Sequence, residues 1–150
     1  MSQTGSSSTD VRKAFSLTDL LLNRAFRLFA PAKVNLGLEV TGRRSDGFHS
    51  VVTLLETVSL FDVIDVRPFP GLQVISDDRI TRDEDLSRRA LERIQEWRGA
   101  RLNISVRIQK YIPISAGLGG GSSDAGTLIS AIGAMAGMPR DIRHQIASEL

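Results

Sequence analysis

The sequence has no cysteine and only two histidines, His49 and His144. The lack of cysteine excludes disulfides, thiolate metal ligands and a cysteine nucleophile, and two histidines argue against a histidine-rich metal site. No apolar run approaches the roughly 18 residues that a membrane-spanning helix needs. With 19 basic and 17 acidic side chains the net charge is only +2, so no basic excess points to nucleic acid. These absences predict a soluble chain without nucleic-acid or membrane partners.

The composition and length fit one globular domain preceded by an extension. The 150 residues are 41% hydrophobic and 24% charged, enough for one domain with a real core. Residues 1–28 begin "MSQTGSSSTD" and continue Arg-rich, which predicts an N-terminal extension that is disordered or a loose basic helix. It has a weak likeness to an organelle transit peptide, against which Asp10 and Asp19 argue. We therefore expect residues 29–150 to form the domain and the protein to be cytoplasmic, with a plastid-type organelle as the alternative.

Alternating apolar residues predict several strands. In "APAKVNLGLEV" the alternation puts Lys33 and Asn35 on one face and the apolar residues on the other, as in a half-buried strand. Asp46-Gly47 marks a turn-rich loop over residues 41–50. Residues 51–69 are expected to form two strands broken near residues 59–62. A short strand follows in "LQVIS", and "RLNISVRIQK" has the cleanest alternation of all.

Three segments have helical periodicity. In "RDEDLSRRALERIQEWRG" acidic residues are expected to fill the first turn and Gly99 to follow the end, while Trp97 falls on the apolar stripe and is predicted to be core. A second helix is expected after residue 121, and a third from Pro139 onward. The apolar residues of the last two helices are Leu128, Ile129, Ile132, Met135, Ile142, Ile146 and Leu150.

The segment "IPISAGLGGGSSDAGTLI" carries the strongest chemical signal. It joins a predicted strand to a predicted helix, so its glycines allow backbone N–H groups to converge at the positive end of the helix dipole. Ser122 and Ser123 are expected to cap the helix and to offer hydroxyls to phosphate or Mg²⁺. The alternative is a tight connection without a ligand, but three consecutive glycines favour a phosphate site. Neither the P-loop motif nor the dinucleotide-binding fingerprint fits these residues.

Two motifs together resemble one kinase superfamily. "IPISAGLGGGSSDA" is similar to the phosphate-binding loop of the galactokinase–homoserine kinase–mevalonate kinase–phosphomevalonate kinase (GHMP kinase) superfamily. "APAKVNLGLEVTGRRSDGFHSVVTL" sharpens this to the 4-diphosphocytidyl-2-C-methyl-D-erythritol kinases of the non-mevalonate isoprenoid pathway. The resemblance implies an α+β fold like the second domain of ribosomal protein S5, a mixed β-sheet backed by helices. It also implies transfer of the γ-phosphoryl group of ATP to the 2-hydroxyl of the small-molecule substrate.

The resemblance assigns residues to the acceptor side of this reaction. Lys33 matches the lysine of the P-A-K-x-N motif and would be catalytic, stabilising the charge that develops on the transferring group. Asn35 matches a substrate contact of the same motif. His49 matches a histidine that hydrogen-bonds cytosine, and Phe48 stands where the family has tyrosine, so stacking on cytosine would survive the loss of the hydroxyl.

The resemblance also implies an ATP site, with ATP and Mg²⁺ as cofactors and no residue assigned as a metal ligand. Asp124 could assist Mg²⁺ or accept N–H bonds at the helix start, where an aspartate is otherwise usually a cap. Asp85 falls at a contact in the adenine region, and Lys110 near the nucleotide. The residues assigned to ATP are Asp85, Lys110, Pro113, Gly117, Leu118, Gly119, Gly120, Gly121, Ser122, Ser123 and Asp124.

One departure from the family concerns the general base. The family's catalytic aspartate lies in a G-[AS]-D-[VI]-P motif, which this sequence does not contain, and its members are about twice this length. We therefore expect an N-terminal portion, incomplete at its C-terminus and inactive alone, as a monomer or homodimer. The alternatives are a non-catalytic S5-like binding module and another GHMP small-molecule kinase; "GRRSDGFH" argues against the latter.

Overall fold

The structure is a computed structural model, and it describes residues 23–150 except 44, 46, 77–78, 80 and 82–84. Most of the predicted N-terminal extension, residues 1–22, lies outside the described residues. Residues 26–28, which we assigned to that extension, belong to the first strand instead, and Phe26 and Leu28 pack against the core. The elements are β1 (Phe26–Arg43), β2 (His49–Pro68), β3 (Leu72–Ile75), α2 (Leu86–Arg98), β4 (Ile104–Gln109), α3 (Gly120–Leu128), the π-helical turn η1 (Ile129–Gly133) and α4 (Arg140–Glu149).

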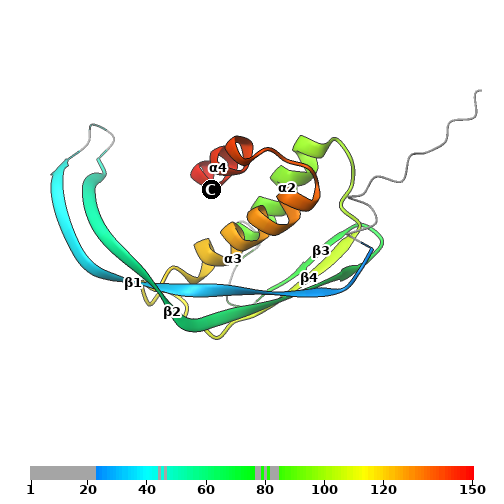
Figure 1. Cartoon of the computed structure of the whole chain (residues 1–150), viewed down its shortest axis with the longest axis horizontal. Helices are drawn as coiled ribbons and strands as arrows, with labels where there is room; N and C mark the ends of the chain where they lie inside the picture. Colours follow the sequence, from blue (N-terminus) through cyan, green and yellow to red (C-terminus); the bar gives the residue numbers. More distant parts are fainter. Residues whose placement is uncertain (1–22, 44, 46, 77–78, 80, 82–84) are drawn as a thin grey trace, which may run out of the picture.

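Four strands form one mixed sheet in the order β1-β2-β4-β3. The pairs β1–β2 and β2–β4 are antiparallel, and the pair β3–β4 is parallel. A parallel pair needs a crossover, and α2 supplies it between β3 and β4. Figure 1 shows the helices gathered on one face of the sheet. The predicted α+β class and the mixed sheet backed by helices are confirmed.

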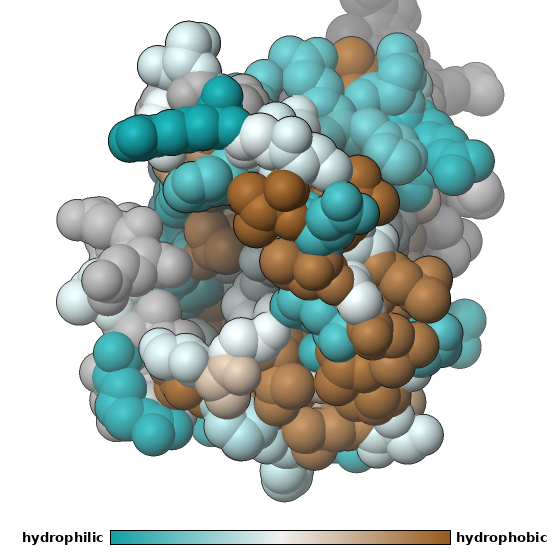
Figure 2. Space-filling view, turned by 90° about the vertical axis from the view of Figure 1, so that its left-hand side faces the viewer, coloured by the Kyte–Doolittle hydropathy of each residue, from teal (hydrophilic) through white to brown (hydrophobic). Residues whose placement is uncertain are grey.

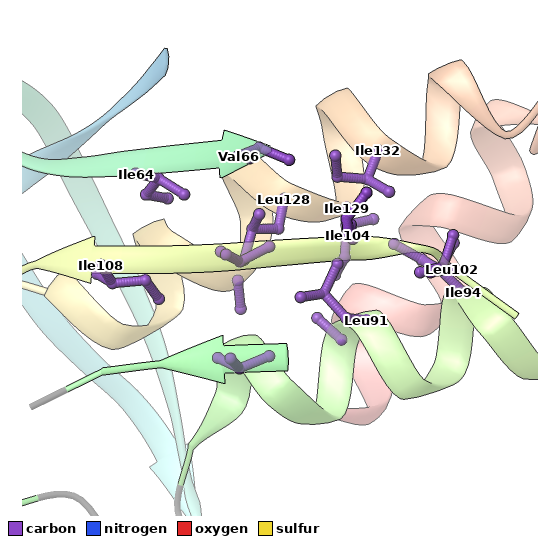
Figure 3. Packing of buried hydrophobic residues seen from close by; sticks show 14 of the residues in the cluster. Ile64, Val66, Leu91, Ile94, Leu102, Ile104, Ile108, Leu128, Ile129 and Ile132 are labelled. Carbon is purple, nitrogen blue, oxygen red and sulfur yellow. The ribbon is translucent and has the colours of Figure 1, made fainter. Parts of the chain in front are cut away.

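The core lies between the sheet and these helices (Figure 3). The alternation predicted for β4 is confirmed at Ile104, Val106 and Ile108, which are buried, and at Arg107 and Gln109, which are exposed. Ser105 departs from it, because this polar residue is buried as well. Each fully buried aliphatic side chain contributes about 1.5–3 kcal/mol through removal from water. The other large members of the core are Ile64, Val66, Leu91, Ile94, Leu102, Leu128, Ile129 and Ile132.

Helix α2 has a defined cap at each end. Asp85 is the N-cap and accepts from the backbone N–H groups of Ser87 and Arg88, whereas Gly99 ends the helix in the left-handed conformation. The expectation that acids fill the first turn is wrong: the helix starts after Asp85 and has no acid in that turn. The core assignment of Trp97 is also wrong, since the residue is 43% exposed at the last turn.

Strands β1 and β2 extend beyond the helix layer as a two-stranded arm, defined here as residues 36–43 and 49–55. Residues 49–68 form one strand, not two, because the expected break is a β-bulge: Pro31 pairs with Phe61 but Ala32 with Val58. Strand pairing also reaches Arg43 and His49, so the turn is shorter than predicted. The prediction of a half-buried strand is wrong along the arm, because its apolar residues are exposed. They are Leu36, Leu38, Val40, Val51, Val52, Leu54 and Leu55. Figure 2, which faces this end, shows apolar surface gathered into a patch.

The predicted helices after the glycine segment are present with altered starts. Helix α3 begins at Gly120 with Gly119 as its N-cap and no side-chain cap, so the predicted Ser122 and Ser123 caps are wrong. It continues into η1, a wider turn that the sequence did not predict. Helix α4 follows Pro139 as expected, with Ile146 buried. Within the ranges that the structure describes, no helix is long and apolar enough to cross a bilayer.

Candidate phosphate-binding site

The loop between β4 and α3 has an unusual backbone. Ser115, Gly117 and Gly119 have positive φ angles of 61°, 74° and 71°. Left-handed residues that alternate with ordinary ones turn successive N–H groups toward one side, as in anion-binding nests. The first N–H to bond back into the helix is that of Ser123, to Gly119 O at 2.9 Å. The N–H groups of residues 120–122 therefore have no intrahelical acceptor and can donate to an anion.

This loop forms the wall of a cleft of about 520 Å³. The cleft contains most of the residues assigned to ATP: Lys110, Pro113 and the whole run 117–122 line it. Ser123, Asp85 and Asp124 are not among the described lining residues, and their contacts with ATP stay predictions. The full lining is Arg79, Leu86, Lys110, Ile112, Pro113, Ile114, Ser115, Ala116, Gly117, Leu118, Gly119, Gly120, Gly121 and Ser122.

Lys33 lies directly on the glycine loop. Its backbone N–H donates to Leu118 O at 3.0 Å, and a Cβ added at Gly119 would come within 3.0 Å of Lys33 Cγ. Only glycine leaves room for this side chain to cross the loop. Lys33 Nζ also donates to Asn35 Oδ1 at 3.4 Å, which confirms that the two predicted residues share a face. The structure thus brings the P-A-K-x-N motif and the glycine loop together.

Below the loop lies a buried ionic cluster, Asp62–Lys110–Asp124. Lys110 Nζ donates to a carboxylate oxygen of Asp62 and to Asp124 Oδ2 at 2.6 Å. Burial lowers the pKa of Lys110, but the hydrogen bonds to Asp124 and Asp62 outweigh it and the net pKa is raised. Burial raises the pKa of Asp124 to about 6, against the opposing effect of Lys110. Lys110 is therefore held by two acids and is not a free cation of the cleft.

The expected capping role of Asp124 at the start of α3 is wrong, and its role toward Mg²⁺ stays a prediction. Its side chain does not cap α3 and does not line the cleft. Oδ2 bonds Lys110, and Oδ1 is buried without a hydrogen-bond partner in the described structure. The side chain is bound into the support under the loop.

Phe48 and His49 lie at the far end of the arm. Phe48 is 72% exposed, and His49 pairs with Arg43, whereas Lys33 pairs with Thr57. Ten residues of strand separate Lys33 from Arg43, roughly 33 Å along the chain. The structure therefore does not bring Phe48 and His49 to the glycine loop, and their substrate contacts stay predictions.

Sequence reasoning missed several contributors to the site. Asp62 was read as part of a strand break, although an acid within the apolar run "SLFDVIDV" was a signal of a satisfied buried carboxylate. Arg79 lines the cleft from a turn that carries no motif, and Leu86 and Ile112 supply its apolar walls.

Comparison with known proteins agrees with this geometry. Residues 85–150 match the family described as GHMP kinases N terminal domain. A solved structure, the crystal structure of 4-(cytidine 5'-diphospho)-2C-methyl-D-erythritol kinase, superposes with a TM-score of 0.72 at 38% identity, covering 83% of this chain and 45% of that chain. The chain contains a GHMP kinase N-terminal domain. Homoserine kinase from Cytophaga hutchinsonii, at 22% identity and a TM-score of 0.58 over 83% of this chain and 40% of that one, shares the fold of this domain.

Two curated relatives of this domain carry the same name. The 4-diphosphocytidyl-2-C-methyl-D-erythritol kinase of Persephonella marina is 41% identical over 112 residues, which cover 73% of this chain and 41% of that protein. The kinase of the same name from Geobacillus thermodenitrificans is 41% identical over 101 residues, covering 64% of this chain and 35% of that protein. The chain spans about two fifths of the length of these relatives.

Proposed function

We propose that this domain takes part in ATP-dependent phosphorylation of the 2-hydroxyl of 4-diphosphocytidyl-2-C-methyl-D-erythritol, as the names of its relatives suggest. The observation that carries the proposal is the contact of Lys33 with the glycine loop, through its N–H to Leu118 O at 3.0 Å. A cation beside a phosphate cradle is what phosphoryl transfer needs, because charge spreads over the oxygens of the group in transit.

The chain's residues fit the triphosphate of ATP. The N–H groups of residues 120–122 would donate to its oxygens. A side chain at Gly119 would intrude on Lys33, and one at Gly120 would intrude on Ile112 and Lys110. The described cleft lining contains no carboxylate, so the fit to Mg²⁺ is limited to the Ser115 and Ser122 hydroxyls. Mg²⁺ usually keeps several waters and is held largely by substrate phosphates.

Within this reaction ATP supplies the γ-phosphoryl group, and its transfer to the hydroxyl oxygen releases ADP and the hydroxyl proton. Lys33 Nζ would stabilise the oxygen that gains charge. The proton needs an acceptor, and the described lining of the cleft offers no carboxylate. General-base catalysis contributes typically about 10²–10⁴-fold. We therefore propose that the 150-residue chain binds nucleotide but transfers phosphate slowly by itself.

Calorimetric titration with ATP tests the cradle. We expect the wild-type chain to bind and Gly120→Val to bind at least tenfold more weakly, about 1.4 kcal/mol, because a Cβ there would already lie 3.0 Å from Ile112 Cγ2. Gly126→Val is the matched control: it lies in the same helix, and a Cβ there meets nothing within 4 Å. Equal ATP affinity of wild type and Gly120→Val, or no binding by the folded wild type, would refute the cradle.

The acceptor is tested separately by titrating the chain with 4-diphosphocytidyl-2-C-methyl-D-erythritol, homoserine and mevalonate. We expect heat from the first compound alone, weakened in His49→Ala. His144→Ala removes the other histidine, which lies on α4, and serves as the control. Preferential binding of homoserine or mevalonate would replace the proposed substrate by that of another GHMP kinase.

A further inference from the structure

The cluster Asp62–Lys110–Asp124 has no role in the chemistry described above, yet it is the most deeply buried charged group in the described structure. The side chains of Lys110, Asp62 and Asp124 are 5%, 0% and 3% exposed. Buried ion pairs often contribute little net stability, because desolvation offsets their attraction. Their position relative to the loop is therefore the informative feature.

Asp62 holds the chain where it enters the loop. Its Oδ1 accepts from the backbone N–H of Tyr111 at 2.6 Å and of Ile112 at 2.8 Å. These two residues follow β4 and precede the run 113–119. Asp62 itself lies beside the β-bulge of β2, opposite Ala30 in β1. The carboxylate thus fixes the loop entry to the sheet.

Lys110 carries this connection to the exit of the loop. Its Nζ bonds both Asp62 and, at 2.6 Å, Oδ2 of Asp124, which belongs to the second turn of α3. A Cβ added at Gly120 would come within 3.2 Å of the same Nζ. The ammonium therefore lies directly under the N-terminus of α3, whose free N–H groups face the cleft.

We propose that Asp62 and Lys110 are positioning residues of the glycine loop: they set the distance between its entry at residues 111–112 and the start of α3, and so direct the N–H groups of residues 120–122 at an anionic ligand. The inference rests on the proposed nucleotide function, since ATP is the anion in question. Lys33, bonded to Leu118 O, holds the same loop just before its exit. With the loop fixed at its entry, at Leu118 and at the start of α3, it is preorganised before phosphate arrives.

Two amides report the loop position without touching the substituted side chains. The Lys33 N–H is protected only while Leu118 O stays in place, and the Ser123 N–H only while Gly119 O does. Their hydrogen exchange, measured by NMR on the ligand-free chain, tests positioning without ATP. We expect exchange of both amides to be at least tenfold faster in Lys110→Gln and Asp62→Asn than in wild type.

ATP titration of the same folded variants completes the test. We expect roughly tenfold weaker ATP binding in Lys110→Gln, partial recovery in Lys110→Arg, and a smaller loss in Asp62→Asn, which leaves a neutral Lys110–Asp124 pair. Asp65→Asn is the control, because it removes a carboxylate from the same strand whose partners are the side chains of Arg27 and Gln109 and not the loop backbone. If Lys110→Gln does not fold, Asp62→Asn still tests the proposal.

The outcomes separate this inference from the proposed function. If folded wild type does not bind ATP, the nucleotide proposal fails, and faster exchange of the Lys33 and Ser123 amides still supports positioning. If wild type binds ATP and the folded Asp62 and Lys110 variants bind it equally well, positioning is overturned, whatever their exchange rates. Unchanged exchange in these variants overturns it too.

Discussion

At the scale of single residues, Asp124 is the group whose ionisation most affects the fold. Its pKa is raised from 3.8 to about 6 by burial, so between these values the folded chain binds more protons than the unfolded chain. The unfolding free energy therefore falls as pH rises from about 4 to about 6, by up to about 3 kcal/mol from this group. For most aspartates the unfolding free energy changes with pH in the opposite direction, because their pKa is lower in the folded chain than in the unfolded chain.

Replacing Asp124 by asparagine removes this titration. We expect Asp124→Asn to gain stability relative to wild type as pH rises through 4–6 and to keep that gain at pH 7. Urea unfolding of both chains from pH 4 to 7.5 measures the difference. The hydrogen bond from Arg27 lowers the pKa of Asp65 below 3.8, so Asp65→Asn should show the reverse trend only when the urea series is extended below about pH 4. A stability difference between Asp124→Asn and wild type that does not vary with pH would contradict the buried, raised pKa.

The glycines of α3 are predicted to differ from one another when each is replaced by alanine. Alanine in a helix interior is favoured over glycine by about 0.5–1 kcal/mol, and Gly126→Ala has open space for its Cβ, so we expect that gain. We expect no such gain in stability from Gly120→Ala, because the new Cβ would lie 3.0 Å from Ile112 Cγ2 and 3.2 Å from Lys110 Nζ. Thermal unfolding compares them, and equal gains would mean that Ile112 and Lys110 move aside freely.

Part of the site could be predicted from residue type and part could not. Glycines between a strand and a helix indicate an anion site because backbone geometry alone produces it, and the P-A-K-x-N motif identified Lys33. The pairing of Asp62 with Lys110 joins residues 48 positions apart, and the register that brings them together depends on a β-bulge. One sequence gives no sign of which buried lysine meets which acid, so Lys110 was assigned to the nucleotide and Asp62 was not assigned at all.

At the scale of elements, the capping of α2 by Asp85 can be tested separately from the predicted contact of Asp85 with nucleotide. Asp85 accepts two backbone N–H bonds at 3.0 and 3.2 Å, and losing such a cap costs about 1 kcal/mol. We expect Asp85→Ala to lower the unfolding free energy by this amount and Asp85→Ser to restore most of it, as measured in urea.

The same two variants test the predicted adenine contact of Asp85. A residue that only caps α2 leaves ATP affinity unchanged in both variants at temperatures where they are folded. An ATP affinity that falls in Asp85→Ala and Asp85→Ser alike would show a direct contact, because serine restores the cap and not the carboxylate.

Elements were predictable where one face of the chain meets the core. In β4 and α4 the apolar period matches what is buried, since each packs one side on the sheet–helix core. The same reasoning failed for Trp97 and for the arm, because periodicity reports which residues share a face and not whether anything covers that face. The π-helical turn after α3 was missed for a similar reason: its five residues, Ile129–Gly133, continue the apolar helical pattern, and that pattern does not distinguish a π-helical turn from an α-helix.

At the scale of the whole molecule, the arm is the feature least supported by the fold. An isolated two-stranded hairpin is marginal in water, and this one presents apolar side chains such as Leu38 and Leu54, which are 56% and 63% exposed. Contiguous exposed apolar surface favours association. The patch therefore bears on whether the chain is a monomer or a homodimer, which stays a prediction.

We expect the wild-type chain to self-associate with rising concentration and the double variant Leu38→Lys/Leu54→Lys to remain monomeric, as measured by sedimentation velocity. Ser45→Lys/Ser50→Lys adds the same charge at the tip of the arm without removing apolar surface, so it should still associate. The unfolding free energies should agree within about 0.5 kcal/mol, because the substituted residues are on the surface. A wild-type chain that sediments as a monomer at every concentration would contradict association through the arm.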